Sequence, residues 1–320
     1  MGCSNQVGEA LERYSRVNTK ELNGNGAPEK ASGKATPFVK WVGGKRSIIS
    51  EITSRVPEKF GHYFEPFIGG GALFFELRDR ITTATLADAN VDLVLTYKVI
   101  RDDVERLIMR LRNHAMKHSK EHYYEVRSWH DLTDPIEIAA RLIYLNKTCY
   151  NGLYRVNNSG EFNVPMGNYT NPGIVQEDNL RACNKALQGV ELIVGDFTLI
   201  SPKEGDFVYF DPPYHPVSET ANFVGYGQGG FNEADQTRLR DFLVRLHKSG
   251  AQVMLSNSNT PFIRKLYSDN FFSVGIVNAP RMVNCKPNKR NSVEEVLITN
   301  YGLHETDNGR IPPGENGKQP

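Results

Sequence analysis

The residues with the clearest chemical potential form a short corner, Asp211-Pro212-Pro213-Tyr214, directly after an apolar stretch that is typical of a buried strand. Two consecutive prolines hold φ near about −65° and donate no backbone hydrogen bond, so the corner is rigid. We expect the Asp211 carboxylate and the Pro212 carbonyl to converge there as two hydrogen-bond acceptors, with the flat ring of Tyr214 beside them. Two acceptors and a stacking ring are what an exocyclic amino group on a planar base requires. The corner therefore predicts a binding site for such a base.

A glycine-rich turn, Phe67-Ile68-Gly69-Gly70-Gly71, follows a second strand pattern and precedes a helical one. Glycines let a ligand approach the backbone closely, and the start of the helix offers free N–H groups. Asp88 ends the next strand pattern, 17 residues after Gly71. A ribose-binding acid lies about 20 residues on in nucleotide-binding sheets. The spacing differs from GxGxxG, which argues against a dinucleotide, so the turn and Asp88 together favour a nucleoside-type cofactor.

The elements that must position these residues alternate between strand and helix patterns. This alternation predicts an α/β fold with a doubly wound, mostly parallel sheet, in which ligands bind at the carboxyl ends of the strands. The strand patterns cover residues 62–67, 82–88, 191–197, 206–211 and 252–256, with a terminal hairpin over 271–277 and 292–301. The helical patterns cover residues 73–80, 91–117, 233–247 and 261–267.

Composition divides the chain into a main folded domain, which the resemblance described below implies to be catalytic, an insert and two tails. Residues 1–36 are poor in large apolar side chains, and we expect them to form a disordered tail. Residues 37–118 and 191–302 carry the alternating pattern and form the catalytic domain. Residues 119–190 are polar and aromatic, break this alternation, and are interpreted as an inserted second domain of helices and loops. Residues 303–320 have the composition of a flexible tail.

Composition and charge exclude several classes of protein. The 320 residues contain 38 basic and 37 acidic side chains, and this balance argues against binding polyanions over the whole surface while allowing a local basic cleft. No apolar run reaches the roughly 18 residues of a membrane span. The four cysteines form no CxxC pair, and neither a His/Cys cluster nor a GxSxG motif occurs. We therefore expect a cytoplasmic chain with free thiols, no membrane partner and no metal.

Several motifs resemble a known family. Three stretches resemble the amino-methyltransferases that use S-adenosylmethionine: FEPFIGGGALFFEL, LADAN and FDPPY. Three more are similar to motifs of the Dam-type DNA adenine methyltransferases: FVKWVGGK, YNGLYR and GEFNVPMG. The resemblance covers nearly the whole of residues 37–302, and the motifs occur in the family's order of cofactor motif, recognition insert and DPPY. It implies a Rossmann-like methyltransferase core with an inserted DNA-recognition domain.

The resemblance also implies a binding site for S-adenosylmethionine. The tryptophan of the first motif would pack beside the cofactor, and the following lysine would meet its methionine carboxylate. The glycine-rich turn would line the methionyl side, and Asp88 would accept hydrogen bonds from the ribose hydroxyls. Asp196 and Phe197 would hold the cofactor adenine, although an aspartate after a strand is also an ordinary turn former. The residues assigned to the cofactor are Trp41, Lys45, Phe67, Gly69, Asp88, Asp196, Phe197 and Asp211.

The implied reaction is methyl transfer to the N6 amino group of adenine in double-stranded DNA. Asp211 and the Pro212 carbonyl would accept the two N–H bonds of the amino group, whose lone pair would then point at the methyl group. The activated cofactor makes a metal or a covalent intermediate unnecessary. The target atom is unreachable in a stacked duplex, so the base must be flipped out and stacked on Tyr214.

The predicted insert is the natural place for DNA recognition. The segment from residue 141 to residue 169 contains three basic residues, Arg141, Lys147 and Arg155, but a single acid, Glu161. Aromatic residues lie between them in the sequence. Basic and aromatic side chains on loops suit phosphate contact and base stacking. The resemblance implies that Arg155, Pro165 and Tyr169 read a GATC-type site. The residues assigned to DNA are Tyr150, Asn151, Arg155, Pro165 and Tyr169, and we expect the enzyme to act as a monomer.

Other readings stay open at this point. An amino-methyltransferase acting on RNA or on a protein glutamine usually carries NPPY or lacks the opening KWxGGK motif. A DNA-binding regulator without activity has no need of an intact Asp211–Tyr214 corner, and a nicotinamide dehydrogenase gives that corner no use. The basic loop of residues 286–290 is either a DNA clamp or a solvated hairpin tip. Restriction, replication or repair, and phage roles fit the sequence equally well.

Overall fold

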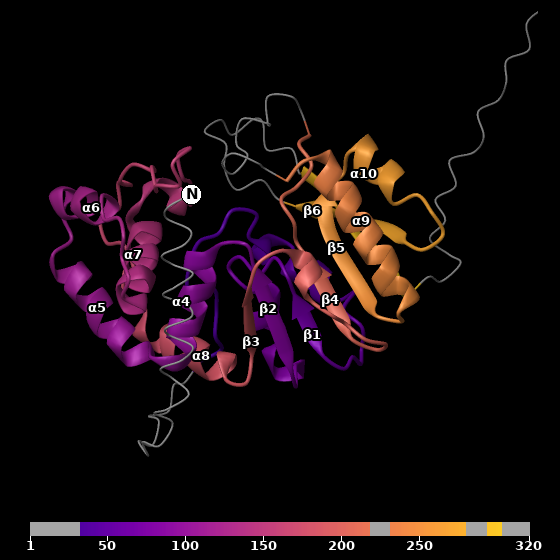
Figure 1. Cartoon of the computed structure of the whole chain (residues 1–320), viewed down its shortest axis with the longest axis horizontal. Helices are drawn as coiled ribbons and strands as arrows, with labels where there is room; N and C mark the ends of the chain where they lie inside the picture. The colour runs from indigo at the N-terminus through magenta and orange to yellow at the C-terminus, as the bar shows by residue number, and fades with distance from the viewer. Residues whose placement is uncertain (1–32, 218–230, 280–292, 303–320) are drawn as a thin grey trace, which may run out of the picture.

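The computed structural model describes residues 33–217, 231–279 and 293–302, which form a seven-stranded sheet with helices packed around it (Figure 1). The strand order is β3-β2-β1-β4-β5-β7-β6, and β7 is the strand that runs antiparallel to its neighbours. The strands are β1 Tyr63–Glu65, β2 Ala84–Asp88, β3 Glu191–Val194, β4 Phe207–Phe210, β5 Gln252–Ser258, β6 Ser273–Ala279 and β7 Val293–Thr299. The doubly wound, mostly parallel sheet and the terminal hairpin are confirmed.

The order of the strands fixes the place of a ligand site. The chain builds β1, β2 and β3 outward in one direction and then returns to place β4 on the other side of β1. In open α/β sheets, ligands bind outside the carboxyl ends of the strands where the order reverses. The glycine-rich turn follows β1, and the Asp211–Tyr214 corner follows β4, so both lie at this reversal. Sheet topology therefore brings together two motifs that are about 140 residues apart.

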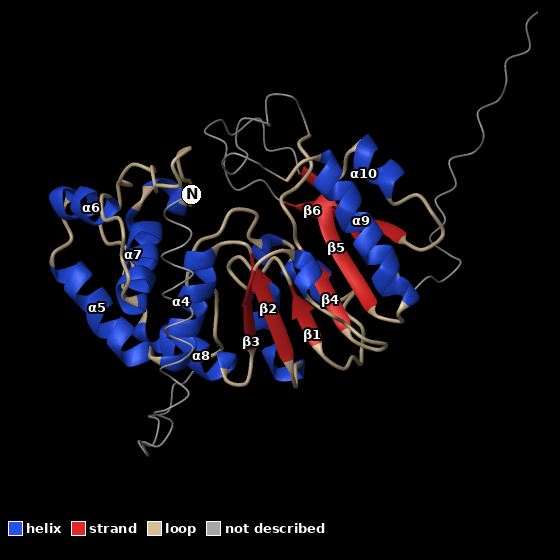
Figure 2. Cartoon of the chain, in the orientation of Figure 1, coloured by secondary structure: helices blue, strands red, loops and turns tan. Residues whose placement is uncertain are grey.

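The helices lie on both sides of the sheet (Figure 2). They are α2 Ile49–Thr53, α3 Ala72–Leu77, α4 Val91–Asp102, α5 Val104–Met116, α6 Lys120–Arg127, α7 Pro135–Thr148, α8 Glu177–Leu187, α9 Glu233–Lys248 and α10 Pro261–Leu266. Figure 1 shows α4 to α8 gathered beyond the β3 edge of the sheet, whereas α9 and α10 lie beside β4 to β6. Within the described residues, no helix is both long and apolar enough to cross a membrane.

The single helix predicted over residues 91–117 is wrong, because the chain breaks at Asp103. The backbone there has φ −149° and ψ 48°, which no α-helix allows, and the Asp103 carboxylate accepts a hydrogen bond from Arg106 instead. The break changes the direction of the chain. Helix α4 can then pack on β2, β3, α7 and α8, while α5 packs on α7 and α8. Tertiary packing, which local periodicity does not report, decides this boundary.

The segment 119–190 contains the three helices α6, α7 and α8, which long loops connect. Helix α7 begins with Asp134, whose carboxylate accepts from the N–H of Ile136, and with Pro135 in its first turn. It is buried along most of its length, and its apolar residues belong to the same hydrophobic cluster as those of α4 and β2. The predicted insert is thus joined to the sheet through one continuous core.

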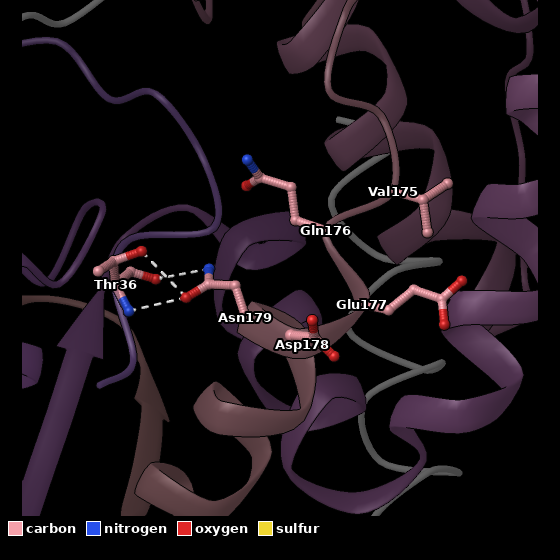
Figure 3. A pocket seen from close by; sticks show the side chains of 6 residues that line it. All are labelled: Thr36, Val175, Gln176, Glu177, Asp178 and Asn179. Carbon is pink, nitrogen blue, oxygen red and sulfur yellow. Dashed lines mark hydrogen bonds between the residues drawn. The ribbon is translucent and has the colours of Figure 1, made fainter. Parts of the chain in front are cut away.

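The N-terminal boundary of the folded body differs from the one that composition indicates. Thr36 donates hydrogen bonds from its N–H and Oγ1 to Asn179 Oδ1, at 2.9 and 3.0 Å, and its carbonyl accepts from Asn179 Nδ2 at 2.9 Å. Figure 3 shows these contacts at the edge of a hollow lined by Thr36 and residues 175–179. Ala35 is buried beside them. Residues 33–36 therefore belong to the body, and residues 1–32 of the predicted tail lie outside the described residues.

A pair of truncations tests this boundary. Removal of residues 1–32, which are poor in apolar side chains, should leave the melting temperature and methyl transfer nearly unchanged. Removal of residues 1–36 should lower the melting temperature by about 2–8 °C, because the Thr36–Asn179 bonds are together worth about 1–2 kcal/mol. Asn179→Ala in the chain that starts at residue 33 is the matched control and should cause a similar loss. Equal stability of both truncated chains would contradict the assigned boundary.

Candidate active site

Two fully buried side-chain amides anchor the Asp211–Tyr214 corner to α9 and β5. Gln236 of α9 donates from Nε2 to the Pro213 carbonyl at 2.9 Å, and Asn257 of β5 donates from Nδ2 to Gln236 Oε1 at 3.0 Å. The Asn257 Oδ1 in turn accepts from the N–H of His215 at 3.1 Å. Among the described residues, no donor bonds the carbonyl of Pro212. The hydrogen bonds of Gln236 and Asn257 fix the backbone after β4.

Asp211, the other predicted acceptor, forms an ion pair with Lys45. The Lys45 Nζ lies 2.8 Å from Asp211 Oδ1, and only 4% of Lys45 is exposed. The same Nζ lies 4.7 Å from the centroid of the Tyr214 ring. Burial raises the pKa of Asp211, and the Lys45 ammonium opposes this rise. The sequence predicts that Lys45 meets the methionine carboxylate of a cofactor, and the structure places its ammonium on the carboxylate of the corner.

Glu65 is a buried acid that the sequence interpretation did not single out. It ends β1, is 2% exposed, and accepts a hydrogen bond from the Tyr63 hydroxyl at 2.7 Å. Burial raises the pKa of Glu65 to about 8, the Tyr63 bond lowers it, and the negative charge of Asp211 raises it further. The available signal was an acidic residue within an otherwise apolar strand pattern, HYFEPF. With this pKa, Glu65 is mainly protonated near pH 7, and it lies close enough to Asp211 for the two carboxyl groups to interact.

The hydroxyl of Tyr214 contacts a second carboxylate that sequence reasoning missed. It donates a hydrogen bond to Glu295 Oε2 on β7 at 2.7 Å. Burial raises the pKa of Tyr214 well above its usual range, and Asp211 and Glu295 raise it further, so the hydroxyl stays protonated and donates. No sequence signal points to Glu295, because 81 residues separate the two partners and only the sheet brings them together.

The glycine-rich turn after β1 is tied to the end of β2. Gly69 has φ +47° and Gly71 has φ +70°, backbone values that favour glycine. The Gly69 N–H donates to Asp88 Oδ2 at 3.1 Å. A Cβ atom at Gly69 would lie 2.7 Å from the Trp41 ring, so this ring packs directly on the turn. The structure thus brings Trp41, Gly69 and Asp88 together, as the sequence predicts.

The other three predicted cofactor residues lie after β1 and β3. Phe67 and Phe197 have ring centroids 5.7 Å apart, and Phe197 is 1% exposed within an apolar cluster. Asp196 accepts two hydrogen bonds from the Arg238 guanidinium, both at 2.9 Å, and also accepts from the N–H and hydroxyl of Thr198. The Arg238 bonds lower the pKa of Asp196. Asp196 is therefore a charged and well-anchored acceptor beside a phenylalanine that packs mainly in the core.

These groups fit S-adenosylmethionine. Asp196, Asp88, the glycine-rich turn and Asp211 follow β3, β2, β1 and β4, which are neighbours in the sheet. The Trp41 ring fills the space in which a side chain at Gly69 would lie. Asp88 is a carboxylate of the kind that binds ribose hydroxyls, and its two oxygens also accept from the N–H groups of Gly69 and Asn90. Within residues 33–217, 231–279 and 293–302, no three His, Cys, Asp or Glu side chains form a group that could hold a metal ion.

The residues predicted to bind DNA gather around the end of α7 and the hairpin that follows it. Tyr150 is 55% exposed, and its N–H donates to the Pro165 carbonyl at 2.9 Å. Asn151 has a left-handed backbone, with φ +56°, and its side chain is exposed. Arg155 is exposed and donates from Nε to Asn163 Oδ1 at 2.7 Å, which orients its guanidinium. Four of the five predicted residues therefore lie on one stretch of surface loop.

The fifth, Tyr169, connects this loop to the opening motif. The Lys40 ammonium lies 4.6 Å from the centroid of the Tyr169 ring. The buried Asn146 of α7 bonds both the N–H and the carbonyl of Lys40, at 2.8 and 2.7 Å. The next residue, Trp41, stacks on Tyr154 with a centroid distance of 5.2 Å. The opening motif, residues 38–45, thus packs between the glycine-rich turn and the loop that carries the residues predicted to bind DNA.

The basic and aromatic side chains of residues 141–169 do not all face solvent, which corrects the interpretation of their composition. Arg141 donates to the carbonyls of Val126 and Arg127 at the end of α6, where helix carbonyls need partners. Tyr144 and Phe162 are buried. Composition cannot distinguish these core and capping roles from DNA contacts. The basic loop of residues 286–290 and the tail 303–320 lie outside the described residues.

Comparisons with known proteins agree with this geometry. Residues 41–283 match the model of the family described as D12 class N6 adenine-specific DNA methyltransferase. The chain is 43% identical over 275 residues to the Type II methyltransferase M1.LlaDCHI of Lactococcus lactis subsp. cremoris, which covers 83% of this chain and 95% of that one. It is 44% identical over 287 residues to the Type II methyltransferase M.MjaIII of Methanocaldococcus jannaschii (83% and 99%). It is also 32% identical over 279 residues to the DNA adenine methylase of Haemophilus influenzae (85% and 96%).

Proposed function

The chain belongs to the D12 class N6 adenine-specific DNA methyltransferase family, and we propose that it methylates the N6 amino group of a flipped adenine within a GATC-type site of duplex DNA. The observation that carries this proposal is the corner after β4. It presents a half-buried Asp211 carboxylate, a Pro212 carbonyl that no described donor bonds, and the Tyr214 ring at the point where the strand order reverses. These are two acceptors and a stacking surface for an adenine amino group.

The residues on the other strands are proposed to bind S-adenosylmethionine. This cofactor supplies an activated methyl group, so the protein needs only to bind and orient the reactants. Asp88 would accept from the ribose hydroxyls, Asp196 from the adenine amino group, and the turn at Gly69 would line the methionyl chain with Trp41 beside it. Lys45 would hold Asp211, on which its ammonium lies at 2.8 Å.

The corner would act on the target base by orientation. The amino nitrogen of adenine is a weak nucleophile because its lone pair is delocalised into the ring. Asp211 and Pro212 would accept one N–H bond each, which favours a pyramidal nitrogen with its lone pair free. Tyr214 would stack on the base, which must leave the duplex because its N6 atom is unreachable within the stack. Recognition of the GATC-type site is proposed for Arg155 and Pro165 on the exposed loop and for Tyr169 beside Lys40.

Methylation-sensitive sequencing of plasmid DNA from cells that express the protein tests this function directly. The host should lack adenine methylation of its own, and the Asp211→Ala variant should be expressed in parallel. We expect N6-methyladenine at GATC in the parent sample and none in the variant sample. Methylation at a different adenine sequence would retain the enzyme class and reject the site. Absence of methyladenine, with methyl transfer to RNA or protein by the purified chain, would reject the proposed function.

The proposed role of Asp196 gives a separate prediction. Asp196→Ala should weaken binding of S-adenosylmethionine about 5- to 12-fold, the equivalent of one hydrogen bond of about 1–1.5 kcal/mol. The kcat at saturating cofactor should change little, since the bond is made before and during transfer alike. The matched control is Arg238→Ala, which removes the ion-pair partner but keeps the acceptor, and it should leave the Kd within about twofold. Equal weakening in both variants, by titration calorimetry, would assign Asp196 a structural role only.

A further inference from the structure

Tyr214 is held at two points by groups from opposite ends of the chain. Its hydroxyl donates to Glu295 Oε2 at 2.7 Å, and its ring lies beneath the Lys45 ammonium at 4.7 Å from the centroid. A phenol fixed only through its backbone can still rotate about its side-chain bonds. A bond at the hydroxyl together with a cation at the ring face removes that freedom. The ring plane of Tyr214 is therefore set by Lys45 and Glu295.

The register of β7 explains why Glu295 reaches the corner. Glu295 pairs with Ser258 of β5, and the Ser258 hydroxyl donates to the carbonyl of His215, the residue directly after Tyr214. Successive side chains on a strand point to opposite faces. The neighbouring Glu294 accordingly is exposed and accepts from Asn259 Nδ2. Two adjacent acids of one strand thus have separate partners, and only Glu295 contacts the corner.

The environment of Tyr214 fixes the direction of this hydrogen bond, in which the hydroxyl donates and Glu295 accepts. The Tyr214 hydroxyl remains protonated, because burial and the nearby carboxylates raise its pKa. The distance of 2.7 Å between the Tyr214 hydroxyl and Glu295 Oε2 is that of a well-formed hydrogen bond. The bond therefore holds the end of the Tyr214 side chain in place.

We propose that Glu295 is a positioning residue for the reaction, which fixes the position of the Tyr214 ring on which the flipped adenine stacks. This inference rests on the proposed function. It assigns Glu295 no contact with the adenine or the cofactor; Glu295 acts on the ring through the Tyr214 hydroxyl, and it also raises the pKa of Asp211 electrostatically. Loss of the bond should reduce the fraction of productively stacked base, and hence kcat, without changing cofactor affinity.

The experiment uses the full chain with four substitutions. Glu295→Leu removes the acceptor at nearly constant volume, and Tyr214→Phe removes the donor without touching β7. Each should lower kcat about 5- to 20-fold and leave the Kd for S-adenosylmethionine within twofold. Glu295→Gln retains an acceptor oxygen and should recover most of the parent rate. Glu294→Leu is the matched control on the same strand and should equal the parent. The double variant Glu295→Leu/Tyr214→Phe should be no slower than the slower single variant.

A second measurement reports on the base directly. With 2-aminopurine in place of the target adenine, the fluorescence of the flipped base in the parent complex should be quenched by the stacked ring, and both Glu295→Leu and Tyr214→Phe should relieve this quenching. Multiplicative losses of kcat in the double variant, or unchanged quenching, would overturn the positioning role. If Glu295→Leu fails to fold, parent-like kcat and quenching in Tyr214→Phe still overturn it. A parent protein that does not methylate adenine would instead refute the proposed function.

Discussion

Asp211→Asn is expected to lower kcat by roughly 100- to 1000-fold while DNA binding survives. The substitution keeps the shape of the side chain, but it replaces one carboxylate oxygen with an N–H donor that opposes the amino group of the target. Loss of one preorganised group that stabilises the transition state costs about this much in other enzymes. DNA recognition is assigned to the loop around Arg155, so the Kd for DNA should stay within a few-fold. Single-turnover methylation with cofactor in excess measures the chemical step.

Asp211→Ala should inactivate the enzyme as well, although for two reasons that must be separated. It removes the acceptor, and it also leaves the Lys45 ammonium, 5% exposed at its side chain, without its partner at 2.8 Å. An unpaired buried charge destabilises a fold by about 3–5 kcal/mol. The double variant Lys45→Met/Asp211→Ala removes the stranded charge and should regain stability but no activity. A rate for Asp211→Asn above a few per cent of the parent would show that the corner does not hold the amino group.

Arg155→Ala is expected to reduce methylation of GATC by about 5- to 150-fold, equal to the 1–3 kcal/mol of discrimination that a bidentate arginine–guanine contact provides. Sites altered at the guanine should lose much less, so the ratio of rates collapses. The geometry favours this role, because Arg155 is exposed and its Nε donates to Asn163 Oδ1 at 2.7 Å. This bond orients the guanidinium and does not use its two terminal nitrogens. Rates on GATC and on every single-base variant, with parent and Arg155→Ala, measure the effect.

Asn163→Ala is the matched control for this measurement. It removes the group that orients Arg155 and keeps the guanidinium, so it should cause a smaller loss of the same kind, confined to the same base. A phosphate-binding arginine behaves differently: all sites weaken together and the dependence of binding on salt falls by about one ion. Uniform weakening in Arg155→Ala would therefore make Arg155 a backbone contact and leave the guanine reader to be identified.

The motifs whose prolines or glycines impose a local backbone conformation were predictable from the sequence. The double proline after an apolar strand and the glycines after another each define a local conformation, and parallel-sheet topology then brings their strand ends together. Asp88 was found for the same reason, since its position follows from the end of a strand. The helix break at Asp103 was not predictable, because it depends on what α4 and α5 pack against.

Residues whose role depends on a distant partner escaped prediction. Glu295 is an ordinary acid in the sequence and becomes notable only because folding places it beside Tyr214. Glu65 is an acid in an apolar strand pattern, but its proximity to Asp211 likewise depends on the fold. Arg141 shows the converse error, since a basic side chain among aromatic ones suggested DNA contact but caps a helix. Sequence composition reports residue types, whereas burial and partners are properties of the tertiary structure. The core and the surface of residues 119–190 could therefore not be separated in advance.

The packing of the opening motif against both the glycine-rich turn and the loop limits how new DNA sequence specificities can be engineered or can arise in evolution. Asn146 holds the backbone of Lys40, and Tyr154 stacks on Trp41, which itself packs on the glycine-rich turn. A chimera that exchanges residues 119–190 alone would pair a foreign loop with the original opening motif. The mismatch would disturb Trp41 and the glycine-rich turn, which are proposed to bind the cofactor. A transplant that carries the opening motif along with the loop keeps these contacts matched. In this architecture the exchangeable unit is discontinuous in the chain.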